Sequence, residues 1–369
     1  MDRTVCKIDA CSGCGACVDS CSRKAIKIVD SFKSFNAIID DKICIECGAC
    51  ERVCPNVVLV EKKPLIFARQ GWAIDDGVRS RSSSGGIATA LSLSFIKDGG
   101  VVCSCAFDSG KFNFAFADTV EAVSNFAGSK YVKSAPSRVY LQIKDYVKQH
   151  RKVLFIGLPC QVAAVKKIVG NNQYLYTVDL ICHGTPSANL LSLYLNECGH
   201  SINKLEDISF RSNNEFFLSA NSKRITPKSV YDKYTYAFLN GLTYTENCYC
   251  CPYATLHRVS DITLGDSWGS TLPNDEVDKG VSLVLCMSEK GEELLSKADV
   301  KLLNVDLDIA VSNNKQLRNP TVRPPQRERF FDDILRGKTF NSSVSKCFSY
   351  YYFKQSIKVL LMKIKLYHK

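Results

Sequence analysis

Nineteen of the 369 residues are cysteines, and the spacing of eight of them indicates metal-cluster chemistry. Two separate runs have the pattern C-x2-C-x2-C-x3-C, which is typical of chains that bind two 4Fe-4S clusters. These runs are Cys11, Cys14, Cys17 and Cys21, and Cys44, Cys47, Cys50 and Cys54. The doubled pattern therefore predicts two clusters, and with them one-electron chemistry, in the first sixty residues.

The fourth cysteine of each run is expected to serve the cluster of the other run, because it begins a helix and points away from the first three. One cluster would be held by Cys11, Cys14, Cys17 and Cys54, and the other by Cys44, Cys47, Cys50 and Cys21. The alternative is a zinc site or a set of buried thiols, but zinc sites favour paired C-x2-C units without a third and fourth member. Ser22 stands where a proline usually follows such a run, and Cys6 is interpreted as a spare thiol.

Four more cysteines come from three separate segments. Cys160 and Cys182 each follow an apolar run that predicts a strand, and the two runs flank a helical stretch, as in a βαβ unit. Both thiols are expected at the carboxyl edge of a parallel sheet, where such folds place ligands. Cys248 and Cys251 form a C-x2-C pair that would complete a third 4Fe-4S cluster, with Cys250 as a possible replacement. A zinc site, a redox dithiol or buried thiols fit the same spacing.

Small polar residues suggest a phosphate site. Ser83, Ser84, Gly85 and Gly86 open an apolar helical stretch, and Arg79 lies close by in the sequence. Free backbone N–H groups at a helix start can hold phosphate, although an ordinary capped helix explains the same residues.

Two further features remain open. His183, beside Cys182, could donate a proton or make only local hydrogen bonds. The arginines between residues 318 and 329 could clamp an acidic substrate or form a solvated loop.

The elements that must position these residues predict an α+β ferredoxin-like two-cluster module followed by an α/β domain with a mixed, partly parallel sheet. We expect the module at 1–62 and the two parts of the α/β domain at 70–150 and 151–335. Residues 336–369 form a basic, apolar tail that would either pack on the chain or lie on an anionic membrane surface.

Composition narrows the possible partners. The net charge of +11 favours acidic partners such as phosphorylated cofactors, acidic electron carriers or anionic lipids, and nucleic acid is not expected. The residues before Cys11 lack the apolar region of a signal peptide, so a reducing cytoplasm, with possible contact at the inner face of the membrane, is the expected location. No G-x-G-x-x-G follows a predicted strand, which disfavours direct use of NAD(P)H.

Five ordered motifs together resemble the family of coenzyme F420 hydrogenase and dehydrogenase beta subunits, in particular the bacterial members with a fused two-cluster ferredoxin domain. They are RSRSSSGGIATAL at 79–91, GSKYVKS at 128–134, VLFIGLPCQVAAVKK at 153–167, DLICHGTPS at 179–187, and CYCCP at 248–252 followed by SDITLGDSWG at 260–269.

The resemblance implies a flavin, usually FAD, next to the third cluster, with hydride passing between the flavin and an organic acceptor. It gives Arg79, the turn at 83–86, Lys130 and Tyr131 cofactor-binding roles. It also makes His183, Lys130 and Asp266 the candidate catalytic residues. A small organic or deazaflavin-like substrate is implied, while the coenzyme F420 itself is not carried over.

Electrons are expected from reduced ferredoxin or a redox partner subunit. Two other functions stay open at this point. One is a non-catalytic electron-transfer subunit of a larger redox complex, and the other is an accessory protein of surface-polysaccharide biosynthesis with structural clusters.

Overall fold

The first sixty residues form a compact α+β module in the computed structural model, which describes residues 3–136, 138–212 and 214–363. Its strands β1 (Ile26–Asp30) and β2 (Phe35–Ile39) pair antiparallel, and its helices are α1 (Ala16–Ser20) and α2 (Ala49–Arg52). Each helix starts after a glycine with positive φ, Gly15 at 82° and Gly48 at 66°. Because only glycine adopts this conformation without strain, the repeat in sequence produces a repeat in structure.

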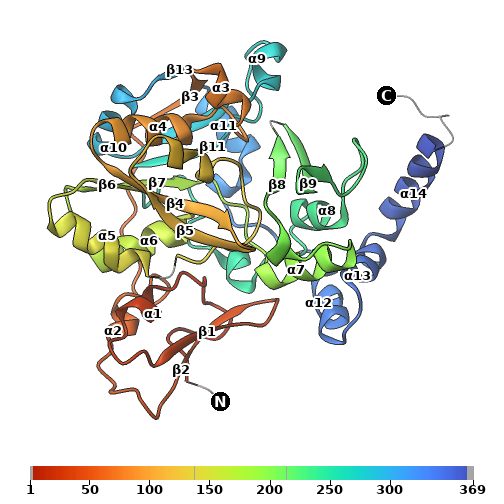
Figure 1. Cartoon of the computed structure of the whole chain (residues 1–369), viewed down its shortest axis with the longest axis horizontal. Helices are drawn as coiled ribbons and strands as arrows, with labels where there is room; N and C mark the ends of the chain where they lie inside the picture. The colour runs from red at the N-terminus through yellow and green to blue at the C-terminus, as the bar shows by residue number, and fades with distance from the viewer. Residues whose placement is uncertain (1–2, 137, 213, 364–369) are drawn as a thin grey trace.

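A single eight-stranded sheet forms the centre of the molecule (Figure 1). Its order is β13-β3-β12-β11-β7-β6-β4-β5, with parallel pairing among β4, β6, β7 and β11 and antiparallel pairing elsewhere. This confirms the mixed, partly parallel sheet. The strands are β3 (Phe67–Ala73), β4 (Val101–Asp108), β5 (Lys111–Ala117), β6 (Val153–Gly157), β7 (Leu175–Leu180), β11 (Ile262–Asp266), β12 (Ser282–Cys286) and β13 (Val300–Asn304).

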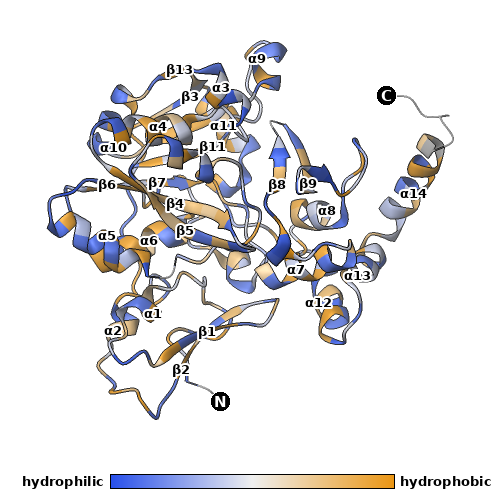
Figure 2. Ribbon diagram, in the orientation of Figure 1, coloured by the Kyte–Doolittle hydropathy of each residue, from blue (hydrophilic) through white to orange (hydrophobic). Residues whose placement is uncertain are grey.

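Helices cover both faces of the sheet, which explains why β6 is apolar and buried at every position. Helices α4 (Ile87–Lys97) and α10 (Glu289–Lys297) pack on one face around Leu154 and Val178. Helices α5 (Val139–Lys148) and α6 (Pro159–Val169) pack on the other. Figure 2 shows hydrophobic residues concentrated along the central strands.

Between β7 and β11 the chain builds an extra unit that the sequence analysis does not separate. It contains α7 (Ala188–Glu197), α8 (Lys233–Leu239) and a small antiparallel sheet of β8 (Ile208–Ser212), β9 (Glu215–Ala220) and β10 (Lys223–Arg224). Helices α12 (Arg327–Leu335) and α13 (Phe340–Cys347) complete its core through Phe330 and Phe340.

The described part of the tail contains a basic helix. Helix α14 (Ser349–Lys363) projects from the body of the molecule (Figure 1), and residues 364–369 of the predicted tail lie outside the described residues. No helix in the described part of the chain is long and apolar enough to cross a membrane.

Short helical segments connect these parts. They are α3 (Asp76–Ser80), α9 (Asn274–Asp278), α11 (Leu307–Asn313) and the 3-10 segments η1 (Glu121–Phe126), η2 (Ile202–Lys204), η3 (Glu246–Cys250) and η4 (Lys315–Leu317).

Candidate functional site

The second cysteine run meets the last cysteine of the first run in the module. Cys44, Cys47, Cys50 and Cys21 line one cavity of about 300 Å³. Cys47 is exposed, whereas the other three are half-buried. This grouping agrees with the crossed arrangement, in which Cys21 leaves its own run.

The complementary group is more deeply buried. Cys11, Cys14, Cys17 and Cys54 are all buried, and Cys54 packs with Cys11 and Cys17 in one apolar cluster. Burial, together with the charges of nearby Cys11 and Cys54, raises the pKa of Cys14 to about 12. Cys6, interpreted as a spare thiol, lies within hydrogen-bonding distance of Cys11 and Cys54.

The four cysteines from three distant segments also converge. Cys160 lies in the first turn of α6, and Cys182 follows β7. Cys248 lies in η3, and Cys251 directly follows it. All four line a single cavity of about 260 Å³, together with Cys250. Burial raises the pKa of the Cys182 thiol, and the other three thiols raise it further.

The chemistry of these donor sets fits 4Fe-4S clusters. Each set is all sulfur, the ligand type that such clusters take. Among the described residues, no three His, Cys, Asp or Glu side chains converge closely enough to hold a single metal ion. Thiols with raised pKa values release their protons when a metal binds, because thiolate is the ligating form.

The third cavity opens toward the module. Ala10, Ser12, Asn56 and Leu59 of the module line it beside the cysteines of the α/β domain. The charge of Cys160 raises the pKa of Cys14, so these thiols of different sets are electrostatic neighbours.

Two tyrosines of the α/β domain make hydrogen bonds to the module. The Tyr140 hydroxyl donates to the Cys14 carbonyl at 2.9 Å, and the Tyr253 hydroxyl donates to the Pro55 carbonyl at 3.3 Å. The structure thus places the third set directly against the Cys11 set.

A buried arginine holds the cysteine loop in place. Arg327 is fully buried, and its guanidinium donates to the Tyr244 carbonyl, the Glu246 carboxylate and the Lys33 carbonyl. It therefore ties α12 to the loop before Cys248 and to the module. Neither sequence interpretation of the 318–329 arginines, a substrate clamp or a solvated loop, describes this residue.

The two motifs assigned to the flavin lie side by side. The Ser129 backbone N–H donates to the Ser83 hydroxyl at 2.7 Å, which joins the 128–134 motif to the turn before α4. Gly86 caps α4 with φ of 80°. The Lys130 ammonium donates to three backbone carbonyls, those of Phe126, Ala127 and Gly128, and so closes the η1 loop.

Other residues predicted for the flavin are occupied within the protein. Arg79 is 4% exposed, and its guanidinium binds the Glu276 carboxylate at 2.6 Å and the Gly280 carbonyl at 2.8 Å. It faces α9 and the loop after it rather than a free phosphate position. At Gly85 an added Cβ would lie 2.3 Å from the Gly71 carbonyl oxygen, so this glycine is required by packing alone.

Two of the predicted catalytic residues, His183 and Asp266, are electrostatic neighbours, because burial lowers the pKa of His183 and the charge of Asp266 opposes this. Asp266 forms a two-armed ion pair with Arg211, at 2.6 and 2.8 Å. His183 lines the third cavity at its exposed rim. Tyr131 stacks on Phe238 with ring centroids 4.5 Å apart.

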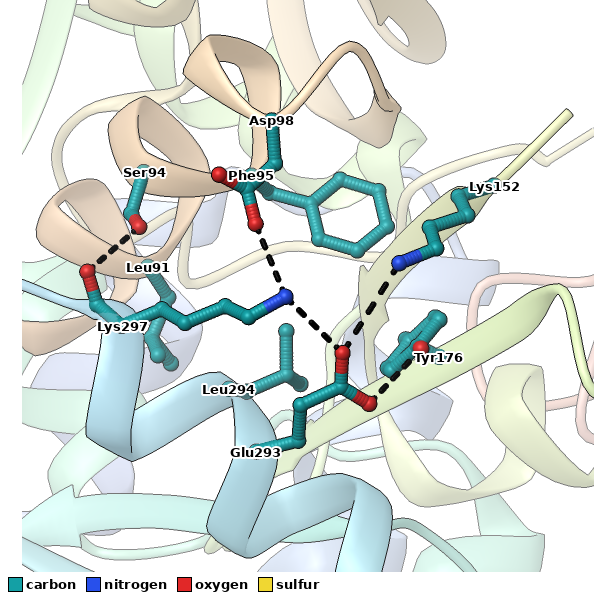
Figure 3. Close-up of a pocket in the computed structure, with 9 residues that line it drawn as sticks. All are labelled: Leu91, Ser94, Phe95, Asp98, Lys152, Tyr176, Glu293, Leu294 and Lys297. Atoms are coloured by element: carbon teal, nitrogen blue, oxygen red, sulfur yellow. Dashed lines mark hydrogen bonds and ion pairs between the residues drawn. The ribbon is translucent and has the colours of Figure 1, made fainter.

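A separate hollow lies between α4 and α10. It has room for about one water, and Figure 3 shows the Glu293 carboxylate paired with Lys152 and Lys297 inside it. The Tyr176 hydroxyl donates to the same carboxylate at 2.9 Å. These charges satisfy one another and leave no open ligand position.

Family models match three stretches of this chain. The family models described as "Coenzyme F420 hydrogenase/dehydrogenase, beta subunit" match residues 68–141 (N-terminal model) and 150–306 (C-terminal model), and a 4Fe-4S dicluster domain matches 10–58.

Three relatives come from methanogenic archaea. A subunit of the F420H2 dehydrogenase of Methanosarcina mazei is 21% identical over 47% of this chain and 53% of its own length. An uncharacterized protein of Methanocaldococcus jannaschii is 25% identical over 78% of this chain and 86% of its own length. The coenzyme F420-dependent sulfite reductase of the same organism is 22% identical over 84% of this chain and 53% of its own length. The match thus spans about half the length of two of these relatives.

One solved structure also matches. A chain of the F420-reducing nickel-iron hydrogenase complex from Methanosarcina barkeri is 20% identical, with a TM-score of 0.49, over 75% of this chain and 96% of that one. With the two family models matched in order behind the dicluster domain, this chain belongs to the family of coenzyme F420 hydrogenase/dehydrogenase beta subunits.

Proposed function

We propose that this chain is an iron-sulfur flavoprotein oxidoreductase that passes electrons from a ferredoxin-like donor or partner subunit through three 4Fe-4S clusters to a flavin and an organic substrate. Its family consists of oxidoreductase subunits, and its N-terminal domain is of the electron-transferring dicluster type. The observation that carries the proposal is the cavity of Cys160, Cys182, Cys248 and Cys251, which opens directly onto the module.

The three thiol sets form a relay in space. Clusters move single electrons and flavin moves a hydride when they are bound. The set with Cys21 and exposed Cys47 lies nearest solvent, the Cys11 set is buried, and the third set lies against it in the α/β domain. An external donor would dock at the Cys47 end, where Ile45 is 59% exposed.

The flavin would lie where the two motifs meet. Ser83, Ser84 and Gly86 stand at the start of α4, beside the 128–134 loop that carries Lys130 and Tyr131. Free N–H groups at this helix start favour a pyrophosphate. Arg79 and Gly85 are left out of the proposed contacts because the protein itself occupies them.

The substrate side is proposed near His183 and Tyr131. His183 lies at the rim of the third cavity, where a proton donor could reach a bound organic molecule. Asp266 would act through Arg211, which it holds with both carboxylate oxygens. A deazaflavin-like substrate is consistent with the relatives that are named for coenzyme F420.

The direct experiment is the iron, sulfide and flavin content of the anaerobically purified full chain. We expect about twelve irons, four for each set, and one flavin. Cys160→Ser should remove about four irons and leave the spectra of the module unchanged.

Other outcomes separate the alternatives. Twelve irons without flavin would favour a non-catalytic relay subunit, a role that the name of the Methanosarcina mazei relative, a dehydrogenase subunit, also suggests. A native chain with no more than eight irons and no flavin would contradict the proposal.

A further inference from the structure

Lys133 is a buried cation that lines the third cavity, and no role was predicted for it from the sequence although it lies in the 128–134 motif. Its side chain is 8% exposed, and its ammonium lies 3.7 Å from the Cys160 sulfur. The backbone N–H of Lys133 donates to the Pro186 carbonyl at 2.9 Å, so the residue is fixed at its base.

Lys133 also reaches the module. An added Cβ at Gly13 would lie 3.4 Å from the Lys133 side chain, which places this side chain over the first cysteine loop. The sulfurs whose charges act on its ammonium belong to both sets: Cys160, Cys182 and Cys248 of the third set, and Cys14 of the Cys11 set. Lys133 therefore stands between two neighbouring cluster positions.

Within the described part of the chain, no carboxylate lies within ion-pair distance of Lys133. The other cation in the cavity, Arg258, is neutralised by buried Asp179 at 3.1 Å. Burying an unpaired ammonium is costly, so its counter-charge must come from what the cavity holds. Thiolate-ligated clusters carry that negative charge, and reduction adds one more.

We propose that Lys133 is a positioning residue whose charge favours the reduced state of the clusters on both sides of it and so sets their reduction potentials. The inference rests on the proposed function, because it requires clusters at these cysteines. The effect should be largest for the third cluster, smaller for the Cys11 cluster, and absent for the Cys21 cluster, whose thiols lie in a different cavity.

The test is a potentiometric titration of the full chain, with each cluster followed by electron paramagnetic resonance. Lys133→Met removes the charge and keeps most of the apolar stem. We expect the reduction potential of the third cluster to become more negative and that of the Cys11 cluster to shift in the same direction by a smaller amount. The reduction potential of the Cys21 cluster should stay unchanged. Lys133→Arg should restore the native potentials. Lys290→Met serves as a matched control, because this ammonium is bound by the backbone carbonyls of Asn172 and Leu175.

Three results would overturn the inference. One is full iron content with unchanged potentials in Lys133→Met. Another is an equal shift of all three clusters. The third is loss of third-cluster iron in both Lys133→Met and Lys133→Gln, which would make the residue structural. A native chain that lacks the third cluster would contradict the proposed function instead, and the shift of the Cys11 cluster alone would then decide the role of Lys133.

Helix α14 carries a second, independent feature. Tyr350, Phe353, Ile357 and Leu360 follow helical spacing along one face and are 71%, 66%, 44% and 59% exposed. The opposite face is anchored, because Tyr351 stacks on Tyr236 of α8 at 3.7 Å. The exposed residues therefore form an apolar stripe on a helix whose other face packs against α8.

The positive charge of the residues after Asp333 favours an anionic partner for this stripe. No Asp or Glu follows Asp333 in the sequence, whereas lysines recur through to Lys369. A short basic helix with an apolar stripe binds the interface of an anionic bilayer, with its lysines toward the headgroups. We infer that α14 docks the chain on an anionic membrane surface.

Co-sedimentation with vesicles tests this surface. The full chain should pellet at low salt with phosphatidylcholine vesicles that contain phosphatidylglycerol, and not with pure phosphatidylcholine. Phe353→Ser with Leu360→Ser should abolish pelleting, while Ile309→Ser with Val322→Ser, at exposed apolar residues elsewhere, should not. Absence of binding to anionic vesicles would overturn the inference, as would a stripe variant that turns a dimer into a monomer, because a second copy would then be the partner.

Discussion

Cys21 is the residue at which the crossed ligand arrangement can be tested. It lines the same cavity as Cys44, Cys47 and Cys50, although it belongs to the other run in sequence. We expect Cys21→Ala to remove or degrade the solvent-near cluster and to leave the buried one intact, so about four irons should be lost. Iron analysis with electron paramagnetic resonance measures this, and Cys198→Ala is the control. Loss of the buried cluster instead would show that each run serves its own cluster.

Gly128 offers a sharper test of the flavin site than the glycines of the turn. A side chain at Gly85 would clash with the Gly71 carbonyl whether or not flavin binds, whereas a Cβ at Gly128 meets nothing within 4 Å. Both Asn and Asp tolerate its φ of 82°, so Gly128→Asp and Gly128→Asn differ only in charge. Repulsion of the pyrophosphate should lower flavin content in the Asp variant alone. Equal flavin content in both variants, measured by absorbance, would show that the phosphate does not bind at this loop.

At the scale of elements, α12 controls the loop that supplies two cysteines of the third set. Arg327→Met would leave the Glu246 carboxylate and the Tyr244 carbonyl without their buried partner, at a cost of about 3 kcal/mol. Because these residues precede Cys248, we expect third-cluster iron to become labile to chelators while the module keeps its iron. Arg329→Met, on the exposed side of α12, is the control. Unchanged chelation kinetics in Arg327→Met would show that the loop is held by other contacts.

At the scale of the whole molecule, the module, the central sheet and the inserted unit contact one another around the cysteines. Asp30 at the end of β1 accepts hydrogen bonds from Ser187 and Asn189 at the start of α7. Asp30→Ala should weaken this contact by about 1.4 kcal/mol, which corresponds to about tenfold faster cleavage of the linker by a protease. Asp9→Ala, whose partner Asn36 lies within the module, should leave the cleavage rate unchanged. Equal rates in the two variants would mean that Asp30 does not support docking of the module.

Much of the site could be predicted from the sequence because it depends on local spacing and on one rule of sheet geometry. The doubled cysteine pattern specifies two ligand sets whatever surrounds them. Cys160 and Cys182 converge because both follow parallel strands that are neighbours in the sheet. Five motifs in order were sufficient to predict the family. The inserted β8–β10 sheet was missed because its short strands carry aromatic and charged residues in no clear alternation.

Other roles depend on contacts between residues far apart in the sequence, so only the tertiary structure decided them. Arg79 looked free for phosphate, but α9 and the loop after it supply a carboxylate and carbonyls from 197 and 201 residues away. Arg327 joins distant segments because folding brings the Lys33 carbonyl and the Glu246 carboxylate within hydrogen-bonding distance of its guanidinium. Lys133 is one of several lysines in the sequence, and it matters because the docked module closes over it and removes it from water. Spacing along the chain determines which atoms can bind a cluster, but burial and charge around that cluster arise only when distant segments pack together.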